Sequence, residues 1–303
     1  MVQPRPGLGY AMVAIAAMLF AVNGTVSKVI LGSGISSGQL TAVRCAGALI
    51  GLTLIAIATR PRSLGVRMGD LPLLVALGIG LAVVQWSYFF AIHRLDIGIA
   101  LLIQYVAPIL VALWARFVFH EPVRRRIWAA LALSLAGLTL IVEIWHGGRL
   151  SGAGVAACVL AAISYAAYVL TAERGVRRRD PISLSAWGFF FASILSSLLA
   201  PWWTFPGGRV DDSVSLLGNL ASTHAPLWAL MLWMVVLGGV VPFALIVSAL
   251  RHISATRAGI TAMLEPVVAI IVAWAWLGES LHPVQLSGAA LTLLGIGLAQ
   301  TAR

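Results

Sequence analysis

Apolar residues occupy most of the chain in long runs separated by short polar connectors. A helix needs about 20 mostly apolar residues to cross the hydrocarbon core of a bilayer. The sequence contains ten such runs, and we expect membrane spans at 8–31, 38–58, 71–91, 97–119, 126–145, 151–172, 182–203, 227–249, 256–277 and 283–301. The pattern therefore predicts an all-α integral membrane protein with ten transmembrane helices.

The lengths of the connectors determine the relative direction of consecutive helices. Nearly all of them are short, so neighbouring helices must be antiparallel. The one long polar connector, 204–226, contains two adjacent glycines and two adjacent aspartates. We expect it to form a loop outside the membrane.

Composition agrees with a lipid environment. Hydrophobic residues make up 60% of the 303 residues and charged residues 10%, with a mean hydropathy of +0.98. A soluble domain usually carries about 25% charged residues. We therefore expect the lipid bilayer to be the solvent for most of the chain.

The net charge of +10 could suggest nucleic acid, but the basic residues are confined to connectors and form no continuous stripe. We therefore expect no nucleic-acid partner.

The distribution of the basic residues instead predicts the orientation of the protein in the membrane, because cytoplasmic connectors are enriched in Lys and Arg. One side holds Arg94, Arg149 and Arg209, and the other holds Arg5, Arg60, Arg62, Arg67, Arg124, Arg125, Arg126, Arg174, Arg177, Arg178, Arg179, Arg251, Arg257 and Arg303. Both termini are therefore expected in the cytoplasm, with the protein crossing a bacterial inner membrane many times.

The two halves of the chain resemble each other. A shift of 158 positions aligns Gly80 with Gly238, Pro108 with Pro266 and Gly137 with Gly295. Near the start of each half a shift of 145 aligns Gly9 with Gly154. The sequence predicts two repeats of five spans, residues 1–147 and 148–303.

Five spans per repeat is an odd number, so the second repeat must start on the opposite side of the membrane from the first. The repeats are therefore expected to have inverted topology. The connector HEPVRRR at 120–126 corresponds to GESLHPV at 278–284, and its three arginines have no counterpart in the second copy. An opposite charge bias in equivalent connectors is what inversion requires.

This layout resembles a known family. The spacing from Pro108 to Glu121 recurs from Pro266 to Glu279, and the second copy reads LEPVVAIIVAWAWLGE. These features resemble the EamA family of the drug/metabolite transporter superfamily. The resemblance is specific in the second repeat and looser in the first, and it implies ten spans, alternating access and export of small metabolites. Among members of the family, the sequence resembles bacterial exporters of aromatic and other amino acids.

Inverted repeats place a transporter's binding site near the bilayer midplane, between the halves. Glu265 is the most informative candidate, because a charged side chain in mid-span costs about 2.5–3.5 kcal/mol on insertion scales. It could bind a substrate amine, carry a proton, or serve only as a structural group at a broken helix. Pro108 and Pro266 each free a backbone carbonyl four residues earlier, and we expect them to be paired kinks, serving either gating or packing.

Other polar and aromatic residues lie at similar depth. Amides and aromatic rings in mid-span either line a cavity or bridge helices; the candidates for substrate binding are Asn23, Gln85, Trp86, Gln104, Tyr105, Tyr165 and Tyr168. Tyr165 and Tyr168 share one helix face, and with Trp86 they could form an aromatic wall. Arg44 could meet a substrate carboxylate, but we expect it to reach a membrane interface or a helix terminus instead.

No motif for a metal, nucleotide or catalytic nucleophile is present, so we expect neither an enzyme nor a cofactor. The leading prediction is a secondary transporter that exports small molecules, most of all amino acids, by alternating access. The alternative is efflux of drugs or lipophilic cations, for which Glu265 would supply the counter-charge. The sequence fixes no oligomeric state, and a monomer is compatible with it.

Overall fold

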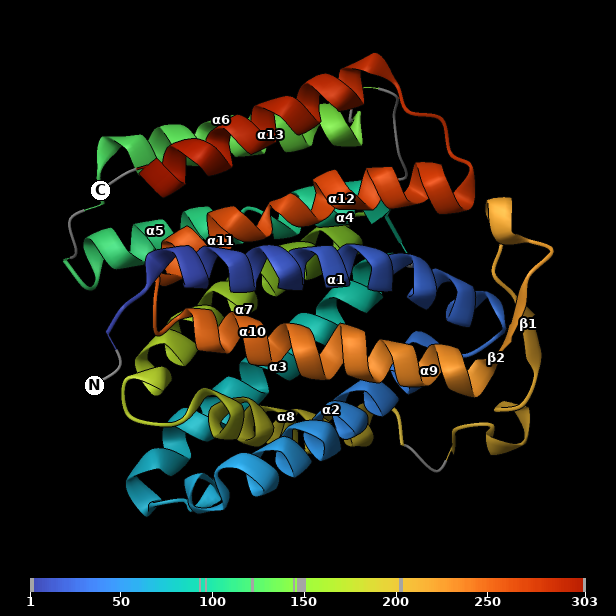
Figure 1. Cartoon of the computed structure of the whole chain (residues 1–303), viewed down its shortest axis with the longest axis horizontal. Helices are drawn as coiled ribbons and strands as arrows, with labels where there is room; N and C mark the ends of the chain where they lie inside the picture. The colour runs from blue at the N-terminus through green and yellow to red at the C-terminus, as the bar shows by residue number, and fades with distance from the viewer. Residues whose placement is uncertain are drawn as a thin grey trace.

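Long helices running between the two ends of the molecule build the structure, a computed structural model (Figure 1). It describes residues 3–92, 94–95, 97–120, 123–143, 145, 151–201 and 204–301. Glu121, Arg149 and Arg303, which entered the sequence comparison of repeats and connectors, lie outside the described residues. Within the described part, ten helical segments are long and apolar enough to cross a membrane.

Seven of these segments are continuous α-helices, and their bounds lie within a few residues of the predicted spans. They are α1 (Pro6–Gly32), α2 (Ser37–Thr59), α3 (Leu71–Ile92), α6 (Arg125–Val142), α7 (Gly152–Val176), α8 (Pro181–Leu199) and α13 (Pro283–Thr301). Local sequence explains where several begin. Ser36 and Gln39 form a capping box at the start of α2, and Asp180 caps α8 directly before Pro181, satisfying amide groups that have no partner within the helix.

The fourth, eighth and ninth spans are interrupted. The fourth consists of α4 (Ile97–Gln104) and α5 (Ala107–Phe117), and the ninth of α11 (Ala255–Ala262), α12 (Leu264–Val272) and the π-helical turn η8 (Ala273–Leu277). The eighth joins α9 (Leu227–Val235) to α10 (Val241–Ala249) through the π-helical turn η7 (Val236–Val240). Pro108 and Pro266 lie in the first turn after the breaks in the fourth and ninth spans, at equivalent places in the two repeats.

Helices α6 and α13, the last of each repeat, pack side by side (Figure 1). The Ser134 hydroxyl lies 3.5 Å from the Thr292 carbonyl oxygen, and the Thr292 hydroxyl lies 3.4 Å from the Ser134 carbonyl oxygen and 2.9 Å from that of Gly288 on its own helix. Ser134 and Thr292 are 158 positions apart, which is the repeat offset. Each repeat thus makes the same contact to the other, as expected for two copies related by a two-fold axis.

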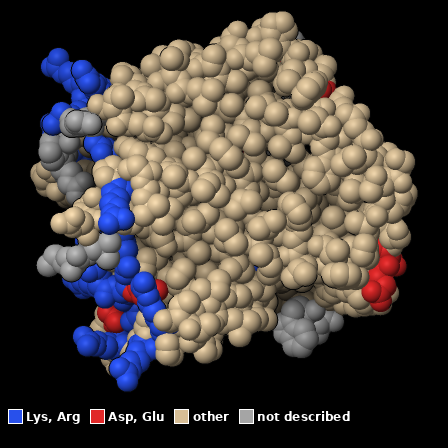
Figure 2. Space-filling model, viewed as in Figure 1, with Lys and Arg blue, Asp and Glu red and all other residues tan. Residues whose placement is uncertain are grey.

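Basic side chains gather at one end of the molecule, where both termini lie (Figures 1 and 2). We call this the arginine-rich end. Here Asp180, before α8, pairs with Arg60, after α2, and with Arg251, after α10. Arg179 pairs with Asp70, before α3, at 2.7 Å. Ion pairs therefore join the connectors at this end.

The long connector lies at the opposite end, which we call the hairpin end (Figure 1). Two short antiparallel strands, β1 (Ser213–Ser215) and β2 (His224–Pro226), form a hairpin in it. Trp276 Nε1 donates to the Leu216 carbonyl at 2.8 Å, which ties the hairpin to the end of the ninth span. The sequence predicted a loop here but not strands, because three-residue strands are too short to show an alternating pattern.

Candidate functional site

A cavity of about 140 Å³ lies in the interior, between helices of both repeats. Its wall includes residues from α1 to α5 of the first repeat and from α7, α10, α11 and α12 of the second. The lining residues are Ala17, Phe20, Arg44, Leu81, Val84, Gln85, Tyr88, Leu101, Gln104, Tyr105, Pro108, Tyr165, Tyr168, Phe243, Ile246, Gly259, Ala262 and Glu265. We call this space the central cavity.

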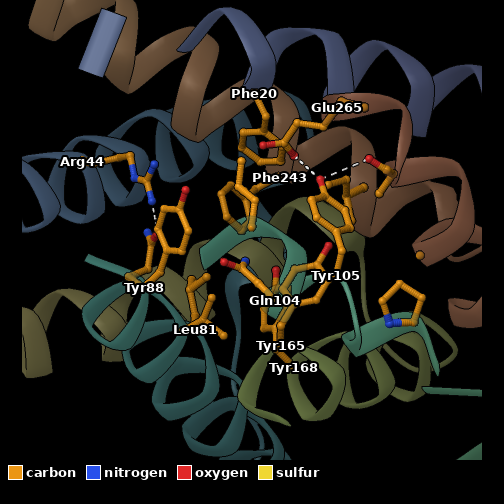
Figure 3. Close-up of a pocket in the computed structure, with 18 residues that line it drawn as sticks. Phe20, Arg44, Leu81, Tyr88, Gln104, Tyr105, Tyr165, Tyr168, Phe243 and Glu265 are labelled. Carbon is orange, nitrogen blue, oxygen red and sulfur yellow. Dashed lines mark hydrogen bonds between the residues drawn. The ribbon is translucent and has the colours of Figure 1, made fainter. Parts of the chain in front are cut away.

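Two opposite charges line the central cavity. Arg44 of α2 and Glu265 of α12 point into it from opposite sides (Figure 3). Arg44 donates a hydrogen bond to the Gln85 side chain of α3, which orients its guanidinium. A cation and an anion held apart across one cavity match a ligand that carries both charges.

Glu265 is held at the break in the ninth span. The Tyr105 hydroxyl lies 2.8 Å from Glu265 Oε2 and 3.3 Å from the Ala262 carbonyl oxygen, and it can donate to either (Figure 3). The Ala262 carbonyl is the one that Pro266 leaves without its usual helical donor. Tyr105 itself lies at the break between α4 and α5. One hydroxyl therefore connects the two broken spans.

Gln104, one residue earlier, offers an unused acceptor. Its Oε1 atom is buried and has no hydrogen-bond partner among the described residues, yet the residue lines the central cavity. Buried polar atoms in proteins are nearly always paired. This oxygen is therefore suited to accept a hydrogen bond from a ligand.

Aromatic rings form one wall. Tyr165 and Tyr168 lie together on α7, with ring centroids 6.5 Å apart, and both line the cavity as expected from their spacing. Phe243 of α10 packs edge-on against Tyr168 at 6.3 Å and against Phe20 at 5.5 Å. Rings in these orientations attract each other beyond simple burial.

Two candidates from the sequence do not line the central cavity. Trp86 follows Gln85 on α3 and so projects about 100° away from it around the helix; its side chain is exposed and lines a separate pocket. The expected aromatic wall therefore contains Phe243 and Phe20 in its place. Asn23 is buried beneath the π-helical turn η7, against Gly238, one turn beyond Phe20.

The structure also adds residues that the sequence interpretation missed. Arg44 was expected at an interface, but Gln85 holds it in the cavity. Tyr88 lies three residues after Gln85 and lines the cavity beside it, a spacing that could have identified it. Phe243 lies in a span that is apolar on every face, so nothing in the sequence distinguishes it.

The size and chemistry of the cavity limit what it can hold. Pockets for drug-sized ligands occupy roughly 300–1,000 Å³, about two to seven times the 140 Å³ found here. No group of three or more His, Cys, Asp or Glu side chains that could hold a metal occurs in the described part of the chain. The arrangement fits a small molecule with one positive and one negative group and an apolar portion.

Comparison with known proteins supports a transport fold. The model of the EamA-like transporter family matches residues 7–143 and 152–301. A crystal structure of another protein superposes with a TM-score of 0.77 and covers 96% of both chains, at 17% identity. That likeness concerns the fold alone.

Curated relatives are also transporters by name. An uncharacterized transporter of Archaeoglobus fulgidus is 27% identical over 225 residues, which cover 73% of this chain and 75% of that protein. The threonine/homoserine exporter RhtA of Escherichia coli K12 is 26% identical over 219 residues, covering 71% of this chain and 66% of RhtA. The uncharacterized transporter YwfM of Bacillus subtilis is 26% identical over 241 residues, covering 78% of this chain and 75% of YwfM.

Proposed function

The chain belongs to the EamA-like transporter family, and we propose that it exports small zwitterionic metabolites, amino acids above all, from the cytoplasm. It is a multi-pass integral membrane protein and a transporter, not an enzyme. The substrate class, the direction and the orientation are the proposed parts.

The observation that carries the proposal is the pair of opposite charges in the central cavity. An amino acid has one carboxylate and one ammonium group on the same carbon. Arg44 can bind the carboxylate through its planar fork of donors, while Glu265, with the Gln104 oxygen nearby, can accept from the ammonium group. The Tyr168, Phe243 and Phe20 rings would then contact the side chain of the substrate.

The transport mechanism that we propose is based on the two repeats. We propose that residues 1–147 and 148–303 act as two inverted halves that rock around the central cavity, so that it opens to one side and then to the other. The breaks before Pro108 and Pro266 are the proposed flexing points, because they lie on the cavity wall in both halves.

The orientation is proposed on the charge distribution. Basic side chains are concentrated at the end where both termini lie (Figure 2), and such enrichment favours the cytoplasmic side. We therefore propose that the termini lie in the cytoplasm and the hairpin end outside, in the inner membrane of a bacterium. The printed name of one relative, the threonine/homoserine exporter RhtA, supports amino acids as cargo.

Efflux of lipophilic cations is the competing function within the family. It would use Glu265 as counter-charge, but Arg44 in the same cavity would repel a cation. The structure therefore favours a zwitterion over a cation as ligand.

The proposal is tested by counterflow in proteoliposomes. Purified protein is reconstituted into vesicles loaded with an unlabelled amino acid, and uptake of the labelled form is followed for threonine, homoserine, phenylalanine and other amino acids in turn. We expect counterflow for at least one of them and none for tetraphenylphosphonium. Counterflow of the cation with no amino acid active would replace the proposed function by cation efflux.

A further inference from the structure

A second cavity, of about 240 Å³, lies at the hairpin end between α2, α3 and α8. None of its lining residues lines the central cavity. Trp86, which the sequence singled out and the central cavity does not use, is part of its wall. We call this space the outer pocket.

One wall of the outer pocket is a ladder of aromatic and cationic groups. Trp86, Phe90 and Arg94 follow one another at intervals of four residues; the first two share one side of α3, and Arg94 lies in a turn after it. The Trp86 and Phe90 ring centroids are 5.3 Å apart, and the Arg94 guanidinium carbon lies 3.6 Å from the Phe90 centroid. One Arg94 donor is used by the Phe90 carbonyl. The guanidinium has five N–H donors, and one hydrogen bond of this group is seen among the described residues, which leaves further donors for a carboxylate.

The facing wall carries hydroxyl groups. The Thr41 hydroxyl donates to the Ser37 carbonyl at 2.9 Å, one turn earlier on α2. Its hydrogen is therefore occupied, whereas its oxygen can still accept. The outer pocket thus combines a cation, an acceptor oxygen and aromatic surface, with a hydroxyl where the central cavity has a carboxylate.

The two cavities lie next to each other along α2 and α3, where one hydrogen bond joins these helices. Thr41 of the outer pocket and Arg44 of the central cavity are three residues apart on α2, a rise of about 4.5 Å. Trp86 of the outer pocket directly follows Gln85 of the central cavity on α3. The hydrogen bond from Arg44 to Gln85 joins α2 and α3 at this point. If the hydrogen bond between Arg44 and Gln85 breaks, α2 and α3, which flank both the central cavity and the outer pocket, lose this link.

We propose that the outer pocket is a second binding site for the same zwitterionic amino acids, occupied on the way out. Arg94 binds the carboxylate, the Thr41 oxygen accepts from the ammonium group, and Trp86 and Phe90 contact the side chain. This inference rests on the proposed function, because it takes the exported substrate as ligand. It adds a site with its own residues and therefore its own affinity.

Substrate protection of an introduced cysteine tests the outer pocket. Leu199 lines it with an exposed side chain, whereas its exposed neighbour Leu198 does not line it. Leu199→Cys and Leu198→Cys are made in the Glu265→Gln background, and their rates of modification by a methanethiosulfonate reagent are measured in detergent with rising L-phenylalanine or L-threonine. The native cysteines, Cys45 and Cys158, are buried.

We expect saturable protection of Leu199→Cys by at least one of the two amino acids and none of Leu198→Cys. At ten times the half-protecting concentration the rate should fall about tenfold, because roughly one site in eleven is then empty. Adding Arg94→Gln should raise the half-protecting concentration about tenfold or more, as expected for a lost charge-assisted hydrogen bond. The half-protecting concentration for Leu199→Cys should be the same whether Glu265 is present or replaced by Gln.

Failure of this inference can be told apart from failure of the proposed function. Counterflow by the Leu199→Cys protein with Glu265 intact reports the proposed function alone. Counterflow without protection, or protection that depends on Glu265 and ignores Arg94, would overturn the outer site and leave the exporter standing. Protection without counterflow would retain the site and remove the export claim.

Discussion

At the level of single residues, the proposed binding of substrate depends on how the central cavity holds its two charges. Glu265 lies within a membrane-length segment and is held by the Tyr105 hydroxyl at 2.8 Å. Arg44 faces it across the cavity and is oriented by Gln85 (Figure 3). Both side chains are hydrogen-bonded by neutral groups from other helices, Arg44 by Gln85 and Glu265 by Tyr105.

Glu265→Gln should weaken amino-acid binding in the counterflow assay. Replacing the carboxylate removes a charge-assisted hydrogen bond to the ammonium group, worth about 1.5–3 kcal/mol, so the half-saturating concentration should rise roughly 10- to 100-fold. The matched control is Glu279→Gln, because Glu279 forms an exposed ion pair with Lys28 at 3.4 Å. Such pairs contribute little, so the control should transport like the unmodified protein; equal effects of the two changes would argue against a binding role.

The sequence identified some of these residues and not others, for physical reasons. A carboxylate in mid-span is costly in lipid, so Glu265 stands out, and helical spacing places Tyr165 and Tyr168 on one face. Arg44 was misjudged because a long side chain near a span end can reach the interface, and its partner Gln85 comes from another helix. Trp86 was considered for the aromatic wall and instead lines a separate pocket; most of α3 is apolar, so its pattern does not orient the ring.

At the scale of helices, the breaks in the fourth and ninth spans are stabilised across the repeats. Tyr105→Phe keeps the ring but removes the donor to Glu265 and to the Ala262 carbonyl. We expect the free energy of unfolding to fall by about 1–3 kcal/mol, because buried acceptors lose their partner. Thermal unfolding in detergent would show this as a lower Tm.

Tyr10→Phe is the control for this change. The Tyr10 hydroxyl is buried and has no hydrogen-bond partner among the described residues. Its removal should therefore leave the Tm unchanged or raise it. If Tyr105→Phe were equally neutral, the hydroxyl would not stabilise the two breaks.

The contact between α6 and α13 makes a separate prediction. A side chain at Gly295 would place its Cβ 2.8 Å from the Ala130 carbonyl oxygen and 2.9 Å from the Ser134 amide nitrogen, whereas at Gly297, on the same helix, nothing lies within 4 Å. Gly295→Val should therefore cost about 1–3 kcal/mol or more through overpacking, and Gly297→Val should not. A Tm that is lowered equally by both would contradict the close packing of the last helices of the repeats.

Helix existence and bounds followed well from the sequence, because the length of an apolar run is set by bilayer thickness. The breaks before Pro108 and Pro266 were also foreseen, since proline removes a backbone donor. The π-helical turns η7 and η8 were not. For η7 the sequence offers a signal, because it contains Gly238 and Gly239 and is followed by Pro242, which removes a backbone donor. The residues of η8 differ in no obvious way from their neighbours.

At the scale of the whole molecule, the ion pairs of the arginine-rich end should hold that end closed. Asp180 pairs with Arg60 and Arg251 and also caps α8 through the Ile182 and Ser183 amides. Asp180→Asn keeps a good helix cap but removes the charge. We expect it to favour a state in which the connectors after α2 and α10 move apart.

Spin labels at Arg62→Cys and His252→Cys can report this movement by double electron–electron resonance. Asp180→Asn should add a population at longer distance. Asp212→Asn serves as control, because Asp212 pairs with Arg209 in the hairpin connector at the other end, and it should leave the distribution unchanged. Identical distributions for all three proteins would show that the Asp180 ion pairs do not control opening.

The duplication was the most informative large-scale feature of the sequence. The offset of 158 positions reappears in the reciprocal contacts of Ser134 and Thr292. The repeat did not predict the chemistry of the central cavity, because the proposed binding residues differ between the two copies. Glu265 corresponds to Ala107 and Tyr105 to Met263 at this offset, so the acid and its hydroxyl partner come from different halves.

In the proposed transport, Arg44 binds the carboxylate, and Glu265 the ammonium group, of one small substrate. Competition in counterflow by three ligands separates these two roles: the active amino acid, its amide, which lacks the carboxylate, and its deaminated acid, which lacks the ammonium group. Each is measured with the unmodified protein, Arg44→Gln and Glu265→Gln. We predict that Arg44→Gln weakens the amino acid about tenfold or more but not the amide, and that Glu265→Gln weakens the amino acid but not the deaminated acid. Equal losses for all three ligands in both variants would contradict the account.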